Sequence, residues 1–377
     1  MAVFRRKKFH VKHPDGIAEE AGIAATSASS DQDSLTAAIA ADRDSRPMTN
    51  DARTTEPHPL VEPAQVSDAA SKSNESSSVK SSKPTTPYAD APLAQEIADL
   101  SRRRRMLAAD DLPRPASTRV ITVANQKGGV GKTTSTVNLA AALARTGARV
   151  IVIDLDPQGN ASTALGVEHR SETASVYDVI INDVPIEDVI QKSPEFPALY
   201  CIPATIHLAG AEIELVSLVA REQRLRRALD LFLEAAEPRF DYVFIDCPPS
   251  LGLLTINAFV AAREVLIPIQ CEYYALEGLS QLLKNIELIE KHLNPSLGVS
   301  TILLTMYDVR TNLANQVVQD VRDHFPKEVL QTLIPRSVRI SEAPSYGQTV
   351  ISYDPNSPGS LSYREAAAEI ARRGAPV

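Results

Sequence analysis

Short apolar runs rich in β-branched residues alternate along the chain with longer segments in which apolar residues recur every three to four positions. The runs resemble buried strands, and the longer segments have the spacing of amphipathic helices. Strands are expected at residues 120–124, 150–154, 199–203, 242–246, 265–269 and 300–304. Helices are expected at residues 133–145, 215–234, 276–292, 313–325 and 363–373. This alternation predicts an α/β fold with a mostly parallel sheet and helices on both faces.

Polar side chains lie at or just beyond the ends of several predicted strands. They are Asn125, Asp154, Asp156, Asp246 and Gln270. Right-handed crossovers place the carboxyl ends of parallel strands along one edge of the sheet, where nucleotides bind in such folds. The sequence therefore predicts one active edge.

A glycine-rich loop joins the first predicted strand to the first predicted helix. Its glycines let backbone N–H groups turn toward phosphate oxygens, and the helix adds the positive end of its dipole. In such a loop Lys132 reaches the β- and γ-phosphates, and the Thr133 hydroxyl binds Mg²⁺. This P-loop context predicts a nucleoside triphosphate site. The residues expected to contact the nucleotide here are Lys127, Gly128, Gly129, Val130, Gly131, Lys132, Thr133 and Thr134.

The loop departs from the ordinary P-loop pattern at its first position. The pattern G-x-x-x-x-G-K-[ST] begins with glycine, whereas the eight-residue frame here begins with Lys127 and still closes with Gly131, Lys132 and Thr133. A second lysine at the mouth of the loop is more charge than one nucleotide needs. A second use for Lys127 is therefore expected.

The loop is one of five ordered motifs. They are Asn125-Gln-Lys-Gly-Gly-Val-Gly-Lys-Thr-Thr134, Asp154-Leu-Asp-Pro-Gln-Gly-Asn160, Ile245-Asp-Cys-Pro-Pro-Ser250, Gln270-Cys-Glu-Tyr-Tyr-Ala-Leu-Glu-Gly278 and Ile334-Pro-Arg-Ser-Val-Arg-Ile-Ser-Glu-Ala-Pro344. Together they closely resemble the chromosomal ParA/Soj partition ATPases, which carry a deviant Walker A loop. The resemblance covers about residues 118–373, and five ordered motifs are far more specific than a P-loop alone.

The resemblance implies a P-loop NTPase-like fold and a slow, partner-stimulated ATPase that uses ATP and Mg²⁺. Asp246 ends an apolar strand, as a Walker B carboxylate does, and would orient Mg²⁺ with Thr133 as the direct ligand. Asp156 would position the attacking water, with Asp154 in a structural role. Lys127 would cross a dimer interface to the partner's phosphates, so the expected catalytic residues are Lys127, Lys132 and Asp156. Residues similar to those that line the adenine pocket of relatives are Met306, Pro335 and Arg336.

The resemblance also implies partners. Arg310 and Arg339 match arginines through which relatives bind double-stranded DNA without sequence preference. The expected assembly is an ATP-dependent homodimer bound to DNA, which a centromere-bound ParB-type protein releases by stimulating hydrolysis. No membrane partner is expected, and the expected location is the cytoplasm, on the nucleoid. Taken singly, each arginine fits a surface ion-pair residue better, and only the motif match favours the contact with DNA.

Composition divides the chain near residue 117. Residues 1–117 hold ten of the 26 prolines, with 16 basic and 17 acidic groups and few large apolar residues. Such a segment buries too little surface to offset its ordering entropy, so a disordered, low-complexity tail is expected before an ATPase domain at residues 118–377. Most of the net charge of −8 falls on that domain, which would therefore bind DNA only through a local basic patch.

The predicted tail contains two notable segments. Residues 93–109 could form a short helix containing Arg102 to Arg105, either as a solvated charge run or as an extra contact for DNA or an acidic partner. Phe9-His-Val-Lys12 is what the palindrome TTTCACGTGAAA, found in the centromere-like sites of this partition system, encodes in frame, so an embedded DNA site is an alternative to chance. A start at Met106 would leave a chain close to a family member without a tail.

Several alternatives fit the sequence less well. No apolar run approaches eighteen residues, which argues against a transmembrane helix. A membrane-cycling regulator of the MinD type would need a basic amphipathic C-terminal helix with large apolar anchors, but residues 364–377 are alanine-rich. The cysteines Cys201, Cys247 and Cys271 match no metal pattern and are expected to be reduced core thiols.

Overall fold

The computed structural model describes residues 92–108, 112–272 and 275–374. They belong to one compact unit that spans Ser82–Val377. Residues 9–12, for which an embedded DNA site is one interpretation, and most of the predicted tail lie outside the described residues.

The described residues form an eight-stranded sheet with the order β3-β4-β2-β5-β1-β6-β7-β8. Every neighbouring pair is parallel except β3 and β4. The strands are β1 Arg119–Val123, β2 Val150–Asp154, β3 Gln191–Lys192, β4 Leu199–Ile202, β5 Tyr242–Asp246, β6 Glu264–Gln270, β7 Gly298–Tyr307 and β8 Val329–Pro335. The predicted α/β fold with a mostly parallel sheet is confirmed, and β1 lies between β5 and β6, in the interior of the sheet.

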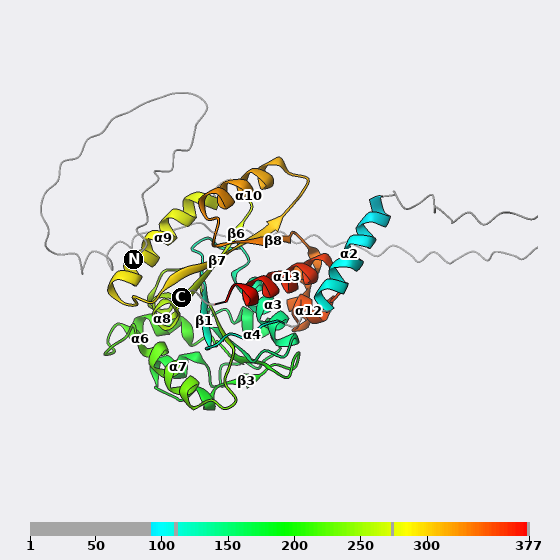
Figure 1. The fold of residues 1–377 in the computed structure, drawn as a ribbon. Helices are drawn as coiled ribbons and strands as arrows, with labels where there is room; N and C mark the ends of the chain where they lie inside the picture. The colour runs from blue at the N-terminus through cyan, green and yellow to red at the C-terminus, as the bar shows by residue number, and fades with distance from the viewer. Residues whose placement is uncertain (1–91, 109–111, 273–274, 375–377) are drawn as a thin grey trace, which may run out of the picture. The chain divides into compact units, whose positions relative to one another are not determined.

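Helices cover both faces of the sheet (Figure 1) and bury two apolar cores. Successive residues of one strand point into opposite cores, as Val243 and Phe244 of β5 do, so the strands read as continuous apolar runs. One core includes α5 Val176–Ile181, α6 Leu208–Leu215, α7 Arg224–Ala235, α8 Leu253–Ala261, α9 Ala275–His292 and α10 Asn312–His324. The other includes α3 Lys132–Arg145, α4 Asn160–Ala164, α11 Val338–Glu342, α12 Val350–Tyr353 and α13 Pro358–Arg373. No helix within the described ranges is long and apolar enough to cross a membrane.

The helix predicted at residues 215–234 is wrong, because the structure ends α6 at Leu215 and begins α7 at Arg224. A side chain from α8 holds the break between them. Asn257 donates to the carbonyl of Arg221 at 2.8 Å, and its Oδ1 accepts the N–H of Leu225 at 3.2 Å. The apolar periodicity continues through this break, so the sequence pattern did not reveal it.

Helix α2, Pro92–Ala108, packs on α13. Arg103 forms a two-bond fork with the Glu365 carboxylate, at 2.7 Å for each bond, and donates to Ser362 Oγ at 2.9 Å. Arg104 reaches the carbonyl of Asn356, and Arg102 pairs with Asp99 within α2. Three members of the arginine run therefore have partners within the protein, and the compact unit reaches beyond the expected boundary at residue 118.

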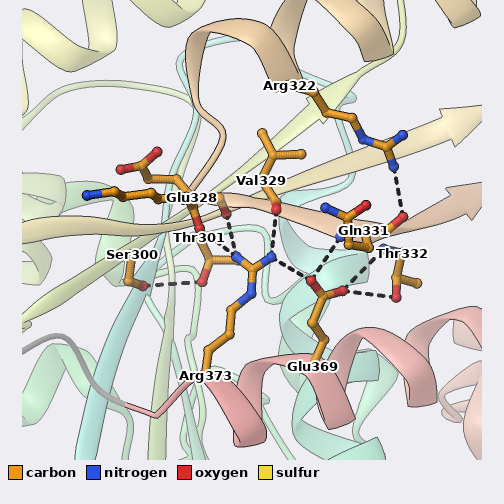
Figure 2. Close-up of polar contacts among 10 residues, drawn as sticks. Ser300, Thr301, Arg322, Glu328, Val329, Gln331, Thr332, Glu369 and Arg373 are labelled. Atoms are coloured by element: carbon orange, nitrogen blue, oxygen red, sulfur yellow. Dashed lines mark hydrogen bonds and ion pairs between the residues drawn. The ribbon is translucent and has the colours of Figure 1, made fainter.

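Side chains close the outer edge of β8, the last strand of the sheet (Figure 2). Glu369 of α13 accepts the N–H groups of Gln331 and Thr332 at 2.9 and 3.2 Å. Arg373 donates to the carbonyls of Lys327, Glu328 and Val329, and Arg322 donates to the carbonyl of Gln331. Except for the Glu328 carbonyl, which also accepts the N–H of Ile302 in β7, these groups would otherwise be free to pair with another strand. No strand was predicted at the position of β8.

Candidate functional site

The glycine-rich loop leaves β1 and enters α3 with the geometry of a phosphate cradle. Gly129 and Gly131 have φ angles of 74° and 87°, which other residues adopt only at a cost. A Cβ added at Gly128 or Gly129 would meet nothing within 4 Å, so these two residues border open space. This space, at the N-terminus of the fourteen-residue helix α3, fits a phosphate group.

Neighbouring strands hold the loop in place. The Asn125 side chain donates to the carbonyl of Pro268 at 2.8 Å and accepts the N–H of Lys127 at 3.0 Å. The Thr305 hydroxyl, near the end of β7, donates to the carbonyl of Val130 at 2.9 Å. Thr305 is not among the predicted site residues, because a threonine within an apolar strand carries no signal of such a contact.

Lys132 begins α3 and is only 7% exposed. Its Nζ lies 3.4 Å from the carbonyl oxygen of Lys127, at the start of the loop. Burial lowers the pKa of Lys132, while the nearby Asp246 carboxylate acts in the opposite direction. The contact with Lys127 is the one hydrogen bond of the ammonium among the described residues, and it is long, so the remaining donors suit it to phosphate oxygens.

Asp246, at the end of β5, is fully buried and joined to α3 by two hydroxyls. Thr133 Oγ1 donates to its Oδ2 at 2.7 Å, and Thr136 Oγ1 donates to its Oδ1 at 3.0 Å. Burial, together with the charge of Asp154, raises the pKa of Asp246 to about 8. A hydroxyl and a carboxylate in direct contact are oxygen ligands suited to Mg²⁺. Thr136 is not among the predicted site residues, although its position three residues after Thr133 places both on one helix face.

Asp154 ends β2, Asp156 lies two residues further on, and the two differ in burial. Asp154 is fully buried and accepts the N–H and hydroxyl of Ser162 at 2.8 and 2.7 Å, and burial raises its pKa to about 6. Asp156 is partly exposed, and its Oδ1 accepts only the N–H of Gln158, at 3.0 Å, among the contacts the structure describes. Asp154 thus stabilises the turn that leads into α4, and Asp156 keeps carboxylate oxygen free for another contact.

A cavity of about 240 Å³ adjoins the loop. The structure brings Met306, Pro335 and Arg336 together in its wall, beside Gly131 and Thr134 of the loop. Other wall residues are Thr305, Ile334, Ser337, Ile340, Ser341 and Tyr363. The cavity begins where the phosphate cradle ends, so its position suits the base of a nucleotide held by the loop.

Comparison with known proteins agrees with this geometry. Residues 118–299 match a family model described as an AAA domain. Over 256 residues the chain is 54% identical to the sporulation initiation inhibitor protein Soj of Bacillus subtilis. The match covers 68% of this chain and 99% of that protein. The chain belongs to the Soj/ParA family. It is also 51% identical to the chromosome partitioning protein ParA of Myxococcus xanthus, over 68% of this chain and 89% of that protein.

A solved structure supports the fold. The crystal structure of a cobyrinic acid a,c-diamide synthase from Mycobacterium smegmatis, with bound ADP and magnesium, is 39% identical to this chain, with a TM-score of 0.57. The match covers 66% of this chain and 92% of that one. The Soj/ParA resemblance inferred from five motifs is confirmed, and with it the class of partitioning ATPase.

In this Soj/ParA-family chain, Lys127 lies outside the buried site. Its side chain is 42% exposed, and its Nζ is 3.4 Å from Oε2 of Glu272, just beyond the end of β6. The other carboxylate oxygen of Glu272 accepts from the Gln270 side chain. The two lysines of the loop are thus separated: Lys132 is buried under the loop, and Lys127 is at the surface.

The two arginines expected to contact DNA follow the ends of neighbouring strands. Arg310 lies in the loop after β7, and Arg339 lies in α11, after β8. Both are exposed, and each is paired with carboxylates of its own chain. The Arg310 hydrogen bonds hold the pKa of Asp308 at about 2. The sequence shows both arginines, but it does not show that they share one edge with the loop.

Proposed function

We propose that this chain is an ATP-driven switch for chromosome or plasmid partitioning, which binds DNA as an ATP-bound dimer and leaves it after hydrolysis. The observation that carries the proposal is the division of the loop lysines. Lys132 is buried under the phosphate cradle, whereas Lys127 is exposed on the same loop. The loop therefore carries one nucleotide site, with Lys132, and one exposed cation, Lys127. This arrangement fits a dimer in which each subunit supplies a cation to the nucleotide site of the other.

The buried side chains would hold Mg²⁺-ATP. Lys132 and the backbone N–H groups of residues 128–134 would bind the phosphates, and Thr133 with Asp246 would hold the metal. Mg²⁺, when bound, neutralises charge on the phosphate oxygens. The fit rests on the open cradle over Gly128 and Gly129 and on the contact between Thr133 and Asp246. A relative 39% identical to this chain holds ADP and magnesium, which supports the same ligands here.

Two residues would act on the reaction itself. Asp156 is the partly exposed carboxylate after β2, and in the proposal it orients the attacking water, because alignment matters more than proton removal by such a weak base. Lys127 would reach the phosphates bound by the partner subunit and stabilise charge there, as an arginine finger does. To do so, it must first leave Glu272.

The base would occupy the cavity lined by Met306, Pro335 and Arg336. The volume of about 240 Å³ and the mixture of apolar side chains with one guanidinium suit a planar heterocycle. The same cavity adjoins Gly131 and Thr134, so one nucleotide could reach both parts of the site.

Arg310 and Arg339 would contact DNA phosphates. A patch assembled from both subunits would bind the backbone without reading bases, with a strong dependence on salt. In the proposal, a ParB-type protein bound at the centromere stimulates hydrolysis and release. The protein would then cycle between cytoplasm and nucleoid, with ATP, dimerisation and DNA affinity linked.

DNA co-sedimentation of the full chain tests the proposal. The protein is mixed with non-specific duplex DNA in ATP, ADP or no nucleotide, each at two salt concentrations. We expect the protein to pellet with DNA only in ATP, and less at the higher salt. Equal binding in all three conditions would contradict the switch and would favour a nucleotide-independent contact, such as the arginines of α2.

A further inference from the structure

Carboxylates of the same chain occupy both predicted DNA-contacting arginines. Arg310 Nε lies 2.9 Å from Asp308 Oδ1, and its Nη2 lies 2.7 Å from Oδ2. Arg339 Nη1 lies 3.1 Å from Glu342 Oε2, and its Nε lies 3.7 Å from Asp354 Oδ2. The guanidinium fork matches carboxylates and phosphates with the same geometry. These acids therefore stand where DNA phosphate oxygens would bind.

The segments that carry these pairs also build the cavity beside the loop. Met306 lies two residues before Asp308 and lines the cavity. Ile340 and Ser341, between Arg339 and Glu342 in the sequence, line it as well. The N–H of Arg336 donates to the carbonyl of Tyr307 at 3.1 Å and so joins the two segments. A ligand in the cavity would contact both segments at once.

The first of these segments holds an unusual backbone conformation. Met306 has a φ of 53°, in the left-handed region that residues with a side chain rarely adopt. Such a conformation persists only where its surroundings hold it, and it is common in segments that switch. The end of β7 is therefore suited to a second arrangement when the contents of the cavity change.

We propose that Asp308 and Glu342 act as internal substitutes for DNA phosphate: they hold Arg310 and Arg339 until ATP binds at the adjoining cavity and frees both arginines for DNA. The inference rests on the proposed function, because it assumes that these arginines contact DNA. The inference adds a second control of DNA binding to the switch. Each subunit would carry contacts that inhibit DNA binding, and the dimer would still be required.

Neutral, isosteric substitutions remove the charge and keep the local structure. Asp308→Asn retains an Oδ1 that can accept the N–H of Arg310, a bond of 3.0 Å here. Glu342→Gln retains an acceptor for the Tyr353 hydroxyl, which lies 3.5 Å away. The matched control is the double variant Asp230→Asn/Glu234→Gln on α7, where Asp230 pairs with Arg226 at 3.6 Å. Both double variants change the net charge equally.

Fluorescence anisotropy with a labelled duplex of arbitrary sequence gives the readout, in ATP, in ADP and without nucleotide. For Asp308→Asn/Glu342→Gln we expect binding without nucleotide to tighten about ten-fold, because two exposed ion pairs are each worth up to about a five-fold change. Binding in ATP should change by less than about two-fold, so the gain produced by ATP shrinks. The control should keep the wild-type gain.

The outcomes separate the inference from the proposed function. Equal tightening in the α7 control, or no tightening without nucleotide in Asp308→Asn/Glu342→Gln, would overturn the inference. Arg310→Ala/Arg339→Ala is measured in parallel. If that variant loses DNA binding while the carboxylate variant behaves as wild type, only the inference fails. If it binds DNA as wild type does, the assignment of the DNA surface fails as well.

Discussion

The two lysines of the phosphate loop are five residues apart and occupy opposite environments. Lys132 is buried under the loop, beside a fully buried Asp246 that two threonines fix in place. Lys127 is at the surface, where one carboxylate holds it at 3.4 Å. The buried half of this sheet edge, which includes Lys132 and Asp246, is positioned by packing of the core. The exposed half, which includes Lys127, is held by surface ion pairs that can exchange with solvent.

The difference indicates how one sheet edge can serve two kinds of partner. Core packing can preorganise a site for a ligand that always binds in the same position. A cation intended for a second molecule must remain accessible, and an exposed ion pair holds it at little cost because such pairs are worth at most about 1 kcal/mol. Lys127, Arg310 and Arg339, which we propose contact a second molecule, are all exposed and held by such ion pairs.

Replacing the buried lysine should have the largest effect. Lys132→Ala removes the ammonium under the cradle, so we expect ATP affinity to fall more than about 100-fold, since charge-assisted hydrogen bonds to several phosphate oxygens are lost together. Nucleotide-dependent DNA binding should disappear as well. Titration with a fluorescent ATP analogue measures this, with the exposed Lys192→Ala as the control. Retained affinity would contradict a buried phosphate site.

Asp156→Ala should separate binding from turnover. Without the aligning carboxylate, we expect hydrolysis to fall about 100-fold, because misplaced reactants lose roughly that factor. The ATP-bound dimer should then remain on DNA. Phosphate release and DNA retention are measured together, and free turnover would contradict the role assigned to Asp156.

The exposed arginines should affect DNA but not assembly. For Arg310→Ala/Arg339→Ala we expect a loss of at least about ten-fold in DNA affinity and a shallower salt dependence, by about one unit of slope for each lost phosphate contact. Light scattering in ATP should still detect the dimer. Loss of the dimer would place these arginines in the interface between subunits.

Buried Asp246 should make the stability of the folded protein depend on pH. The pKa of Asp246 is raised in the folded protein, from 3.8 to about 8, so its stabilising contribution is present below about pH 4 and is lost as pH rises through 8. Asp246→Asn removes this loss. Without nucleotide and Mg²⁺, the free energy of unfolding of the variant should therefore rise relative to that of the wild type between pH 5 and pH 8, by up to about 1.4 kcal/mol per pH unit. Melting temperatures measured across this pH range should show the same trend. A difference that does not vary with pH would contradict the buried, protonated carboxyl.

The smallest effect is expected at Glu272. Glu272→Gln frees Lys127 for a partner subunit, so the midpoint of ATP-dependent dimerisation should fall to a protein concentration a few-fold lower. Sedimentation velocity across a dilution series measures it, with Glu168→Gln, at the exposed pair with Arg170, as the control. A higher midpoint would mean that Glu272 aligns Lys127 for the partner instead of restraining it.

The sequence predicted the buried residues of the nucleotide site better than the side chains that hold the surrounding backbone in place. Lys132 and the strand-end carboxylates follow from motif and position, because a phosphate cradle needs particular residues at particular spacings. Thr305 and Asn257 hold backbone groups of segments distant in sequence, so only the fold reveals them. The polar residues Gln331 and Thr332 interrupt the apolar pattern of β8, and their partners come from α13. The pairing of Lys127 with Glu272 joins residues 145 positions apart.

The closed margin of β8 limits how copies of the chain can join. Glu369, Arg373 and Arg322 take up backbone groups that a neighbouring molecule would need for strand pairing, and the strand at the opposite margin, β3, has only two residues. Ribbon-like growth through continuous sheets is therefore blocked on both sides. Contact through the edge that carries Lys127 would instead be two-fold symmetric, and a symmetric contact of this kind is complete after two copies.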